Sequence, residues 1–225
     1  NYRFIKGDIV DETFIIQLFN EHQFDGIIHL AAESHVDRSI ANPKEFIMTN
    51  IVGTINLLNA ARNAWKTDFS GKRFYHISTD EVYGHLGYDD EPFNEKTPYS
   101  PRSPYSASKA SSDLLTLAYF KTYSLPVTIS NTSNNFGPYQ YPEKLIPKAI
   151  TDLLQGKKVT LMGEGENIRD WIYVEDHCRG IDLIIKKGKR GETYCIGSRQ
   201  EKTNKEICMF ILKEMGYDES MIETI

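Results

Sequence analysis

Short apolar runs alternate with longer amphipathic stretches along the first two thirds of the chain. The runs at residues 2–5, 26–30, 73–77, 127–130 and 159–162 are rich in β-branched and aromatic residues and predict strands. The stretches at residues 12–23, 45–64, 105–123 and 143–155 have the apolar spacing of helices. Apolar strands that alternate with helices are typical of a parallel sheet covered by helices on both faces. The pattern therefore predicts a doubly wound α/β fold.

The pattern is less regular beyond Gly156. Strand-like pieces at residues 172–174 and 193–196 flank a predicted helix at 175–186, and a last helix is expected at 204–215. Residues 84–104 contain four prolines and several acidic residues, which predicts a loop.

Composition and charge exclude several classes of protein. A net charge of −5 with 40% hydrophobic and 25% charged residues is ordinary for a globular protein and lacks the basic surface of a nucleic-acid binder. No apolar run has the length of a membrane span. The three cysteines are widely spaced, which argues against a disulfide framework or a zinc site and is compatible with a reducing cytosol. We therefore expect a cytoplasmic protein without a metal, a nucleic-acid partner or a membrane partner.

The two ends of the chain do not have the composition typical of domain termini. The chain starts at Asn1 inside a strand-like run and stops at the mainly apolar residues 221–225, whereas domain termini are usually polar. We therefore expect an internal piece of a longer protein.

Polar segments follow four of the predicted strands, at residues 6–9, 31–37, 78–84 and 131–138. Any single loop after a strand tends to be polar. In a parallel sheet, however, all four would meet at the edge where ligands bind, beyond the carboxyl ends of the strands. The sequence therefore predicts a binding cleft at this edge.

Tyr105 and Lys109 are one helical turn apart, so their side chains share a face of the predicted helix. Ser103 and Pro104 are typical of an N-cap followed by proline at the first helical position. The helix dipole and the lysine charge both favour a phenolate, so we expect the pKa of Tyr105 to be lowered from about 10 toward neutrality. Such a tyrosine is a usable general base. The alternative is an ordinary surface pair on an amphipathic helix.

Asp80 and Glu81 are adjacent carboxylates at the end of a predicted strand. Neighbouring side chains of a strand point to opposite faces, so both reach one site only if the backbone leaves the extended conformation near Thr79. Two carboxylates held close together have separated pKa values, which supplies one acid and one base for an elimination. The alternative is a pair of acids at the start of a helix.

Several segments together resemble the dTDP-glucose 4,6-dehydratases, members of the extended short-chain dehydrogenase/reductase group. They are residues 31–39 (AAESHVDRS), 78–84 (STDEVYG), 105–109 (YSASK), 133–139 (SNNFGPY) and 142–147 (PEKLIP), with the more widely shared 169–176 (RDWIYVED). The match extends over essentially the whole chain. The triplet at 79–81 is the most discriminating part, because epimerases and decarboxylases of the group usually carry other residues there. The resemblance implies a Rossmann-like sheet and tightly bound NAD.

The resemblance also implies the roles of the catalytic residues. Tyr105 would take the proton of the sugar 4-hydroxyl while hydride passes from C4 to NAD, and Lys109 would hold the ribose and tune Tyr105. Thr79 would bond the 4-oxygen. Glu81 would remove the C5 proton and Asp80 would protonate the departing 6-hydroxyl, after which the cofactor returns its hydride to C6.

Binding residues follow from the same resemblance. The residues expected to contact NAD are Asp8, Ile9, Leu30, Ala31, Ala32, Glu33, Ser34, Thr49, Ser78, Tyr105, Lys109 and Asn135. Those expected to contact the nucleotide sugar are Ser34, Thr79, Asn134, Lys144, Leu145, Arg169 and Asn204. Arg169 would face the diphosphate, which suits a guanidinium.

The sequence departs from the family in one respect. No Gly-x-x-Gly-x-x-Gly follows a first strand, and the acidic residue for the adenine ribose is also missing. The resemblance thus implies that an N-terminal βαβ unit and some C-terminal substrate contacts lie outside these residues. It divides the chain into an incomplete NAD-binding domain at 1–135 and a truncated substrate-binding part at 136–225, and allows the two parts to be interleaved. It also implies a homodimer of the full-length protein.

The leading interpretation is a lyase that converts dTDP-glucose to dTDP-4-keto-6-deoxyglucose. The alternatives are another sugar-nucleotide dehydratase, an epimerase or a decarboxylase of the same group, and a non-catalytic NAD-sensing module. Spacing alone does not distinguish a thymidine, uridine or guanosine nucleotide.

Overall fold

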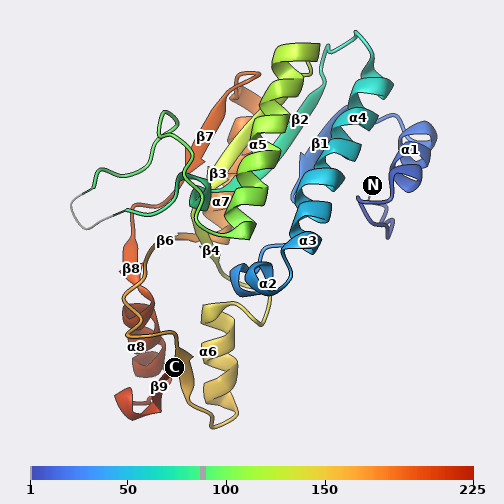
Figure 1. Cartoon of the computed structure of the whole chain (residues 1–225). Helices are drawn as coiled ribbons and strands as arrows, with labels where there is room; N and C mark the ends of the chain where they lie inside the picture. The colour runs from blue at the N-terminus through green and yellow to red at the C-terminus, as the bar shows by residue number, and fades with distance from the viewer. Residues whose placement is uncertain (1, 87–89) are drawn as a thin grey trace. The chain divides into compact units, whose positions relative to one another are not determined.

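The computed structural model describes residues 2–86 and 90–225, which form two compact units (Figure 1). The first, called here the sheet unit, comprises Asn1–Thr132 and Ile181–Ile196. The second, called the smaller unit, comprises Ser133–Gly180 and Gly197–Ile225. Two parts of the chain lie outside the described residues. They are Asn1, which was used to predict that the chain starts inside a longer protein, and residues 87–89 of the predicted loop.

The sheet unit contains most of the predicted strands and helices. Its elements are α1 (Glu12–Glu21), β1 (Gly26–His29), α2 (Val36–Ala41), α3 (Pro43–Phe46), the π-helix η1 (Ile47–Gly53), α4 (Thr54–Trp65), β2 (Arg73–Thr79), the 3-10 helix η2 (Asp80–Tyr83), α5 (Pro104–Tyr123), β3 (Val127–Thr132) and β7 (Thr193–Ile196). Helix α7 (Val174–Lys187) starts in residues of the smaller unit and ends in residues of the sheet unit.

Four strands in the order β1-β2-β3-β7 form the sheet, and each neighbouring pair is parallel. Thr79 pairs with Thr132, and Thr132 pairs with Ile196, so three strands end in one row. Figure 1 shows α4 and α5 along one face of this sheet, with α7 behind it. The predicted Rossmann-like parallel sheet with helices on both faces is confirmed.

Strand β2 is buried on both faces, and its side chains alternate between two cores. Phe74 packs with residues of α1 and α4, whereas Tyr75 and Ile77 pack with Ile184 of α7. His76 lies on the same side as Phe74, and its Nε2 is 3.1 Å from the hydroxyl of Ser112 on α5. The polar residues of β2 on that side therefore lie against α5.

Helix α5 starts where the sequence predicts. The Ser103 hydroxyl accepts the backbone N–H of Ser106, and the Ser106 hydroxyl accepts the backbone N–H of Ser103, each at 3.0 Å. Pro104 follows the cap, and the helix ends at Tyr123, with Ser124 as its C-cap in the left-handed conformation. This reciprocal cap places Tyr105 in the first turn.

Three predicted elements differ from the structure. Residues 2–5 form no strand, because no strand pairs with them among the described residues, and Tyr2 and Phe4 are exposed. The helix predicted at 45–64 is α-helical at its ends but π-helical over Ile47–Gly53. The strand predicted at 159–162 pairs with a strand of the smaller unit rather than with the main sheet.

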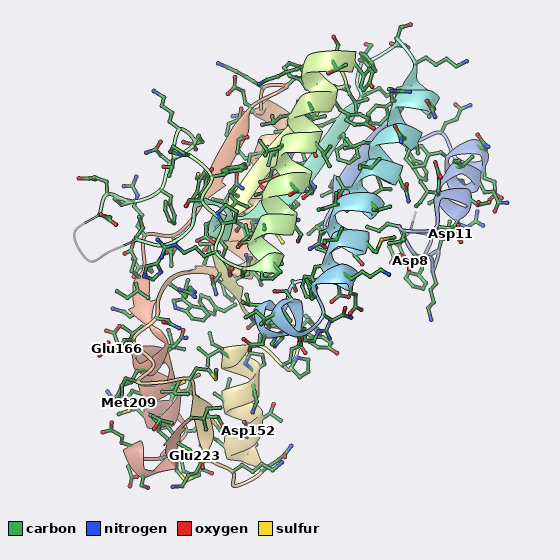
Figure 2. The ribbon with its side chains drawn as sticks, in the orientation of Figure 1. Asp8, Asp11, Asp152, Glu166, Met209 and Glu223 are labelled. Atoms are coloured by element: carbon green, nitrogen blue, oxygen red, sulfur yellow. The ribbon has the colours of Figure 1, made fainter. Side chains whose placement is uncertain are left out.

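The smaller unit combines short strands with two helices. Its elements are β4 (Asn134–Phe136), α6 (Leu145–Leu154), β5 (Val159–Leu161), β6 (Ile168–Tyr173), β8 (Glu201–Thr203), α8 (Asn204–Glu214), the 3-10 helix η3 (Glu219–Met221) and β9 (Ile222–Thr224). Strand β6 lies between parallel β4 and antiparallel β8, and β5 pairs with β9. Figure 2 shows Asp152 on α6 and Met209 on α8, the two helices that form the apolar core of this unit together with β5. Among the described residues, no helix is both long enough and apolar enough to cross a membrane.

Candidate functional site

The end of β2 turns directly into a short 3-10 helix. Thr79 is still extended, and its hydroxyl accepts the backbone N–H of Glu81 at 3.2 Å. The chain therefore leaves the extended conformation immediately after Thr79, as the sequence required for Asp80 and Glu81 to serve one site. The same geometry also makes them first-turn acids of η2, which was the structural alternative.

Tyr105 lies next to this turn. Its hydroxyl is hydrogen-bonded to the side chain of Thr79, and the charges of Glu81 and Asp80 act on it. Phe46 packs edge-on against the Tyr105 ring, with ring centroids 6.3 Å apart. The structure thus brings Tyr105 together with all three residues of the predicted triplet at the carboxyl end of β2.

The predicted direction of the Tyr105 pKa shift is wrong for this structure. Burial raises the pKa of Tyr105 above its ordinary value of 10, and the negative charge of Glu81 raises it further, while the hydrogen bond with Thr79 lowers it. Burial and the charges of the neighbouring carboxylates act in the direction opposite to the one predicted from the helix dipole and the lysine. Tyr105 therefore holds its proton in the structure as it stands.

Lys109 is buried on the same face of α5 and tied to β2. Its ammonium donates a hydrogen bond to the Ile77 carbonyl at 2.8 Å, and only 4% of the residue is exposed. Burial lowers the pKa of Lys109 to about 8, and the charge of Asp113 opposes that shift. Lys109 is thus a buried cation rather than half of a solvated surface pair.

A buried polar cluster around Asp113, one helical turn after Lys109, was not predicted from the sequence. Asp113 accepts hydrogen bonds from the Tyr99 hydroxyl at 3.0 Å and from the Asn131 amide at 3.1 Å. His76 lies against the same carboxylate. One signal was available, because Asp113 follows Lys109 by one further helical turn and so shares its face.

The predicted cofactor residues after β1 are held by Asn50 of η1. Its side chain accepts the backbone N–H of Glu33 at 2.8 Å and donates to the Glu33 carbonyl at 2.9 Å and to the Ser108 hydroxyl at 2.8 Å. Asn50 therefore connects the loop after β1 to α5, and Thr49 precedes Asn50 in the chain. This loop carries Leu30, Ala31, Ala32, Glu33 and Ser34.

The first polar segment lies at the start of α4. The Asn56 amide donates to the Ile9 carbonyl at 3.0 Å, and Asp8 accepts the backbone N–H of Val10. Figure 2 shows Asp8 in the segment beside α1.

The hydroxyl of Ser78 is in an environment that fits a ligand site. This hydroxyl is buried at the end of β2 and has no hydrogen-bond partner among the described residues. A buried hydroxyl without a partner is costly, so it fits a site where a ligand atom would complete the bond. The residues present at this strand end therefore fit a polar cofactor.

The remaining predicted substrate residues belong to the smaller unit. Asn134 and Asn135 lie on β4, Lys144 and Leu145 at the start of α6, Arg169 on β6 and Asn204 at the start of α8. Arg169 pairs with Lys202 on β8, whereas the backbone N–H of Asn204 donates to the Asn167 carbonyl at 3.0 Å, on the other side of the Ile168–Thr203 pair. The Arg169 guanidinium donates to the Ile168 carbonyl at 2.8 Å.

A parallel sheet between helices, with a Tyr-x-x-x-Lys helix against the end of a central strand, defines a Rossmann-like short-chain dehydrogenase/reductase. A family model described as GDP-mannose 4,6 dehydratase matches residues 1–224, and the chain belongs to that family. Within it, the chain is 52% identical over 222 residues to dTDP-glucose 4,6-dehydratase 1 of Escherichia coli K12. That alignment covers 93% of this chain and 62% of the relative, so the chain spans less than two thirds of the relative's length.

Solved structures agree with this assignment. A dTDP-glucose 4,6-dehydratase from Streptomyces venezuelae with NAD bound superposes with a TM-score of 0.92 at 46% identity, over 99% of this chain and 66% of that one. The dTDP-glucose 4,6-dehydratase from Bacillus anthracis in complex with NAD gives 0.88 at 44% identity, over 100% of this chain and 68% of that one.

Proposed function

We propose that this chain carries the chemical centre of a dTDP-glucose 4,6-dehydratase that uses NAD. The observation that carries the proposal is the position of Tyr105 beside Thr79, with the charges of Glu81 and Asp80 acting on its hydroxyl. A tyrosine and a lysine suit any oxidation in this group of enzymes. The two carboxylates add the acid and the base that loss of water requires.

NAD, when bound, would accept a hydride from C4 of the sugar and return it at C6. We assign its binding to the strand-end residues of the sheet unit together with Asn135, namely Asp8, Ile9, Leu30, Ala31, Ala32, Glu33, Ser34, Thr49, Ser78, Tyr105 and Lys109. The unpartnered hydroxyl of Ser78 supports this assignment. Lys109 would hold a ribose hydroxyl.

Oxidation at C4 requires removal of the 4-hydroxyl proton, which is the role of Tyr105. Because burial raises its pKa, Tyr105 needs a positive charge nearby to act as a base. Lys109 lies one turn along the same helix and, when protonated, would favour the phenolate. Thr79 would hold the 4-oxygen through its hydroxyl.

Elimination follows because the new 4-keto group acidifies the C5 proton. Glu81 would take that proton while Asp80 gives one to the 6-hydroxyl. The bond between C6 and oxygen breaks, water leaves, and a double bond forms between C5 and C6. When hydride returns to C6, Glu81 would give its proton back to C5. The position of both acids in the first turn of η2 supports the assignment of one as base and the other as acid.

Substrate binding would add residues of the smaller unit to Ser34 and Thr79. We assign it to Asn134, Lys144, Leu145, Arg169 and Asn204. Arg169 suits a diphosphate because a guanidinium can make two parallel hydrogen bonds to phosphate oxygens. A homodimer and a cytoplasmic location are part of the same proposal and rest on the family resemblance.

The test is product analysis with the full gene product that contains this chain. Given NAD and dTDP-glucose labelled with deuterium at C4, it should form dTDP-4-keto-6-deoxyglucose with the deuterium at C6. A product changed only in configuration at C4 would instead indicate an epimerase. Binding of NAD without turnover of any nucleotide sugar would contradict the catalytic proposal and favour a sensing module.

A further inference from the structure

A buried carboxylate lies behind the Tyr105–Lys109 pair and has no part in the reaction proposed above. Asp113 is 0% exposed and lies one turn beyond Lys109 on α5. One of its oxygens accepts the Tyr99 hydroxyl and the Asn131 amide, and the other is 3.2 Å from Nε2 of His76. A buried side chain with this many polar neighbours is held in one orientation.

Asp113 accepts two hydrogen bonds at a fully buried position. Two donated hydrogen bonds stabilise a carboxylate, but a buried charge still needs a compensating charge. The Tyr83 and Tyr99 hydroxyls face it with pKa values raised mainly by burial, so both stay neutral. Burial lowers the pKa of His76, which favours its neutral form. Among the described groups facing Asp113, Lys109 is the one that can carry a positive charge.

Lys109 in turn faces few groups that could keep it charged. His29 on β1 and His76 on β2 both lie within its electrostatic reach, and burial lowers the pKa of each. Tyr105, one turn earlier on α5, holds its proton in this structure. Asp113 is the group whose charge opposes the effect of burial on Lys109.

We propose that Asp113 is a positioning residue for the Tyr105–Lys109 pair, in which its buried carboxylate is the counter-charge that keeps Lys109 protonated. The same carboxylate holds Asn131, whose amide also donates to the Thr79 carbonyl at 3.2 Å. Asp113 thereby connects the cation on α5 to the strand end that carries Thr79. The catalytic consequence rests on the proposed function, because it takes Lys109 to act in C4 oxidation.

The first test compares two substitutions in the full gene product with NAD bound. Asp113→Asn removes the charge and keeps the size of the side chain. Tyr99→Phe is the matched control, since it removes a hydrogen bond to the same carboxylate and leaves the charge. Both are measured as pH profiles of C4 oxidation in a single turnover, followed by the absorbance of reduced cofactor.

Asp113→Asn should move the alkaline limb of the profile to lower pH by about one unit, a loss of about tenfold in rate on that limb. Tyr99→Phe should leave the limb in place. The proposal is overturned if Asp113→Asn leaves the limb unmoved, or if Tyr99→Phe moves it equally, because the effect would then be structural.

The second test needs no activity. Unfolding free energies are measured for Asp113→Asn, Lys109→Met and the double variant. Asp113→Asn should destabilise much less in the Lys109→Met background, where no buried cation is left without its counter-charge. If Asp113→Asn does not fold, recovery of folding by Lys109→Met supports the proposal. Additive losses, or no recovery, overturn it.

The two tests also separate this inference from the proposed function. If the wild-type protein does not dehydrate dTDP-glucose, the function is wrong, while the stability cycle still reports on the Asp113–Lys109 coupling.

Discussion

The two units of this chain have cores of different chemistry. In the sheet unit, His29, His76, Lys109, Asp113 and Asn131 are buried between the sheet and its helices. The core of the smaller unit is apolar, and its buried members are Ala149, Leu153, Val159, Leu161, Cys208, Ile211 and Leu212. Among the described residues, the buried polar side chains belong to the sheet unit except for Ser133 and His177.

This difference indicates that the fixed charges and dipoles of the chain are concentrated in the sheet unit. Buried polar groups cost free energy unless each is hydrogen-bonded, so an apolar core is the simpler way to stabilise a fold. The sheet unit instead surrounds Tyr105 and Lys109 with a hydrogen-bonded polar network, which holds polar and charged groups in fixed positions. We therefore expect substitutions in the sheet unit to affect the chemical step, and those in the smaller unit to affect binding.

The largest expected effect is that of Tyr105→Phe. The substitution keeps the ring and removes the proposed base, so the rate of C4 oxidation should fall by about 10²–10⁴-fold. Binding of the nucleotide sugar should change little. Stopped-flow absorbance of the reduced cofactor measures the first quantity, and calorimetry the second.

Tyr119→Phe is the matched control on the same helix. Its hydroxyl donates to the Asn59 side chain at 2.7 Å and has no proposed catalytic role, so the rate should stay unchanged while stability falls by about 1 kcal/mol. A near-normal rate for Tyr105→Phe would show that Tyr105 is not the base.

A smaller effect, of a different kind, is expected for Arg169→Gln in the smaller unit. Loss of a charged hydrogen bond to the diphosphate should raise KM by roughly 10–100-fold and leave kcat within a few-fold. Steady-state kinetics separate the two constants. Arg179→Gln is the control, because Arg179 is exposed and pairs with Asp176. A large fall in kcat with unchanged KM for Arg169→Gln would contradict the division between the units.

A graded effect is a pH dependence with opposite signs for activity and stability. Lys109 has a pKa of about 8 in the folded protein, below its ordinary 10.5. Above pH 8 the folded state loses this proton while the unfolded state keeps it, so the contribution of Lys109 to unfolding free energy should rise toward pH 10.5. Activity should fall in the same range, by about tenfold per pH unit, because the cation is lost.

Denaturant unfolding of the wild type and of Lys109→Met at several pH values measures this contribution, as the difference between the two free energies of unfolding. Equal pH dependence in the two proteins would show that Lys109 does not titrate in this range.

Much of the sheet could be predicted because its strands are buried on both faces and therefore form continuous apolar runs. Strand β2 nevertheless continues through Ser78 and Thr79, which pair with Asn131 and Thr132 although they are polar. Strands β4, β8 and β9 have three residues each, too few to show a periodic pattern.

The site was predictable to a similar extent. The motif and the helical spacing identified Tyr105, Lys109 and the triplet at 79–81, because each of these patterns lies within a few neighbouring residues of the sequence. The direction of the Tyr105 pKa shift depends on burial, which spacing does not reveal. Asp113 was missed because an aspartate within a helix is usually on the surface, and its burial depends on Tyr99 and Asn131 from distant segments.

The proposed dehydration depends on Glu81 and Asp80 acting as base and acid in the elimination. In the full gene product, Glu81→Gln should still allow C4 oxidation, so dTDP-glucose should produce enzyme-bound reduced cofactor without a 4-keto-6-deoxy product. In deuterated water, no deuterium should enter C5. Asp80→Asn should differ, with exchange at C5 retained and loss of the 6-hydroxyl slowed by about 10²–10⁴-fold. Formation of the 6-deoxy product at normal rates by both variants would contradict the claim and leave Asp80 and Glu81 as first-turn acids of η2.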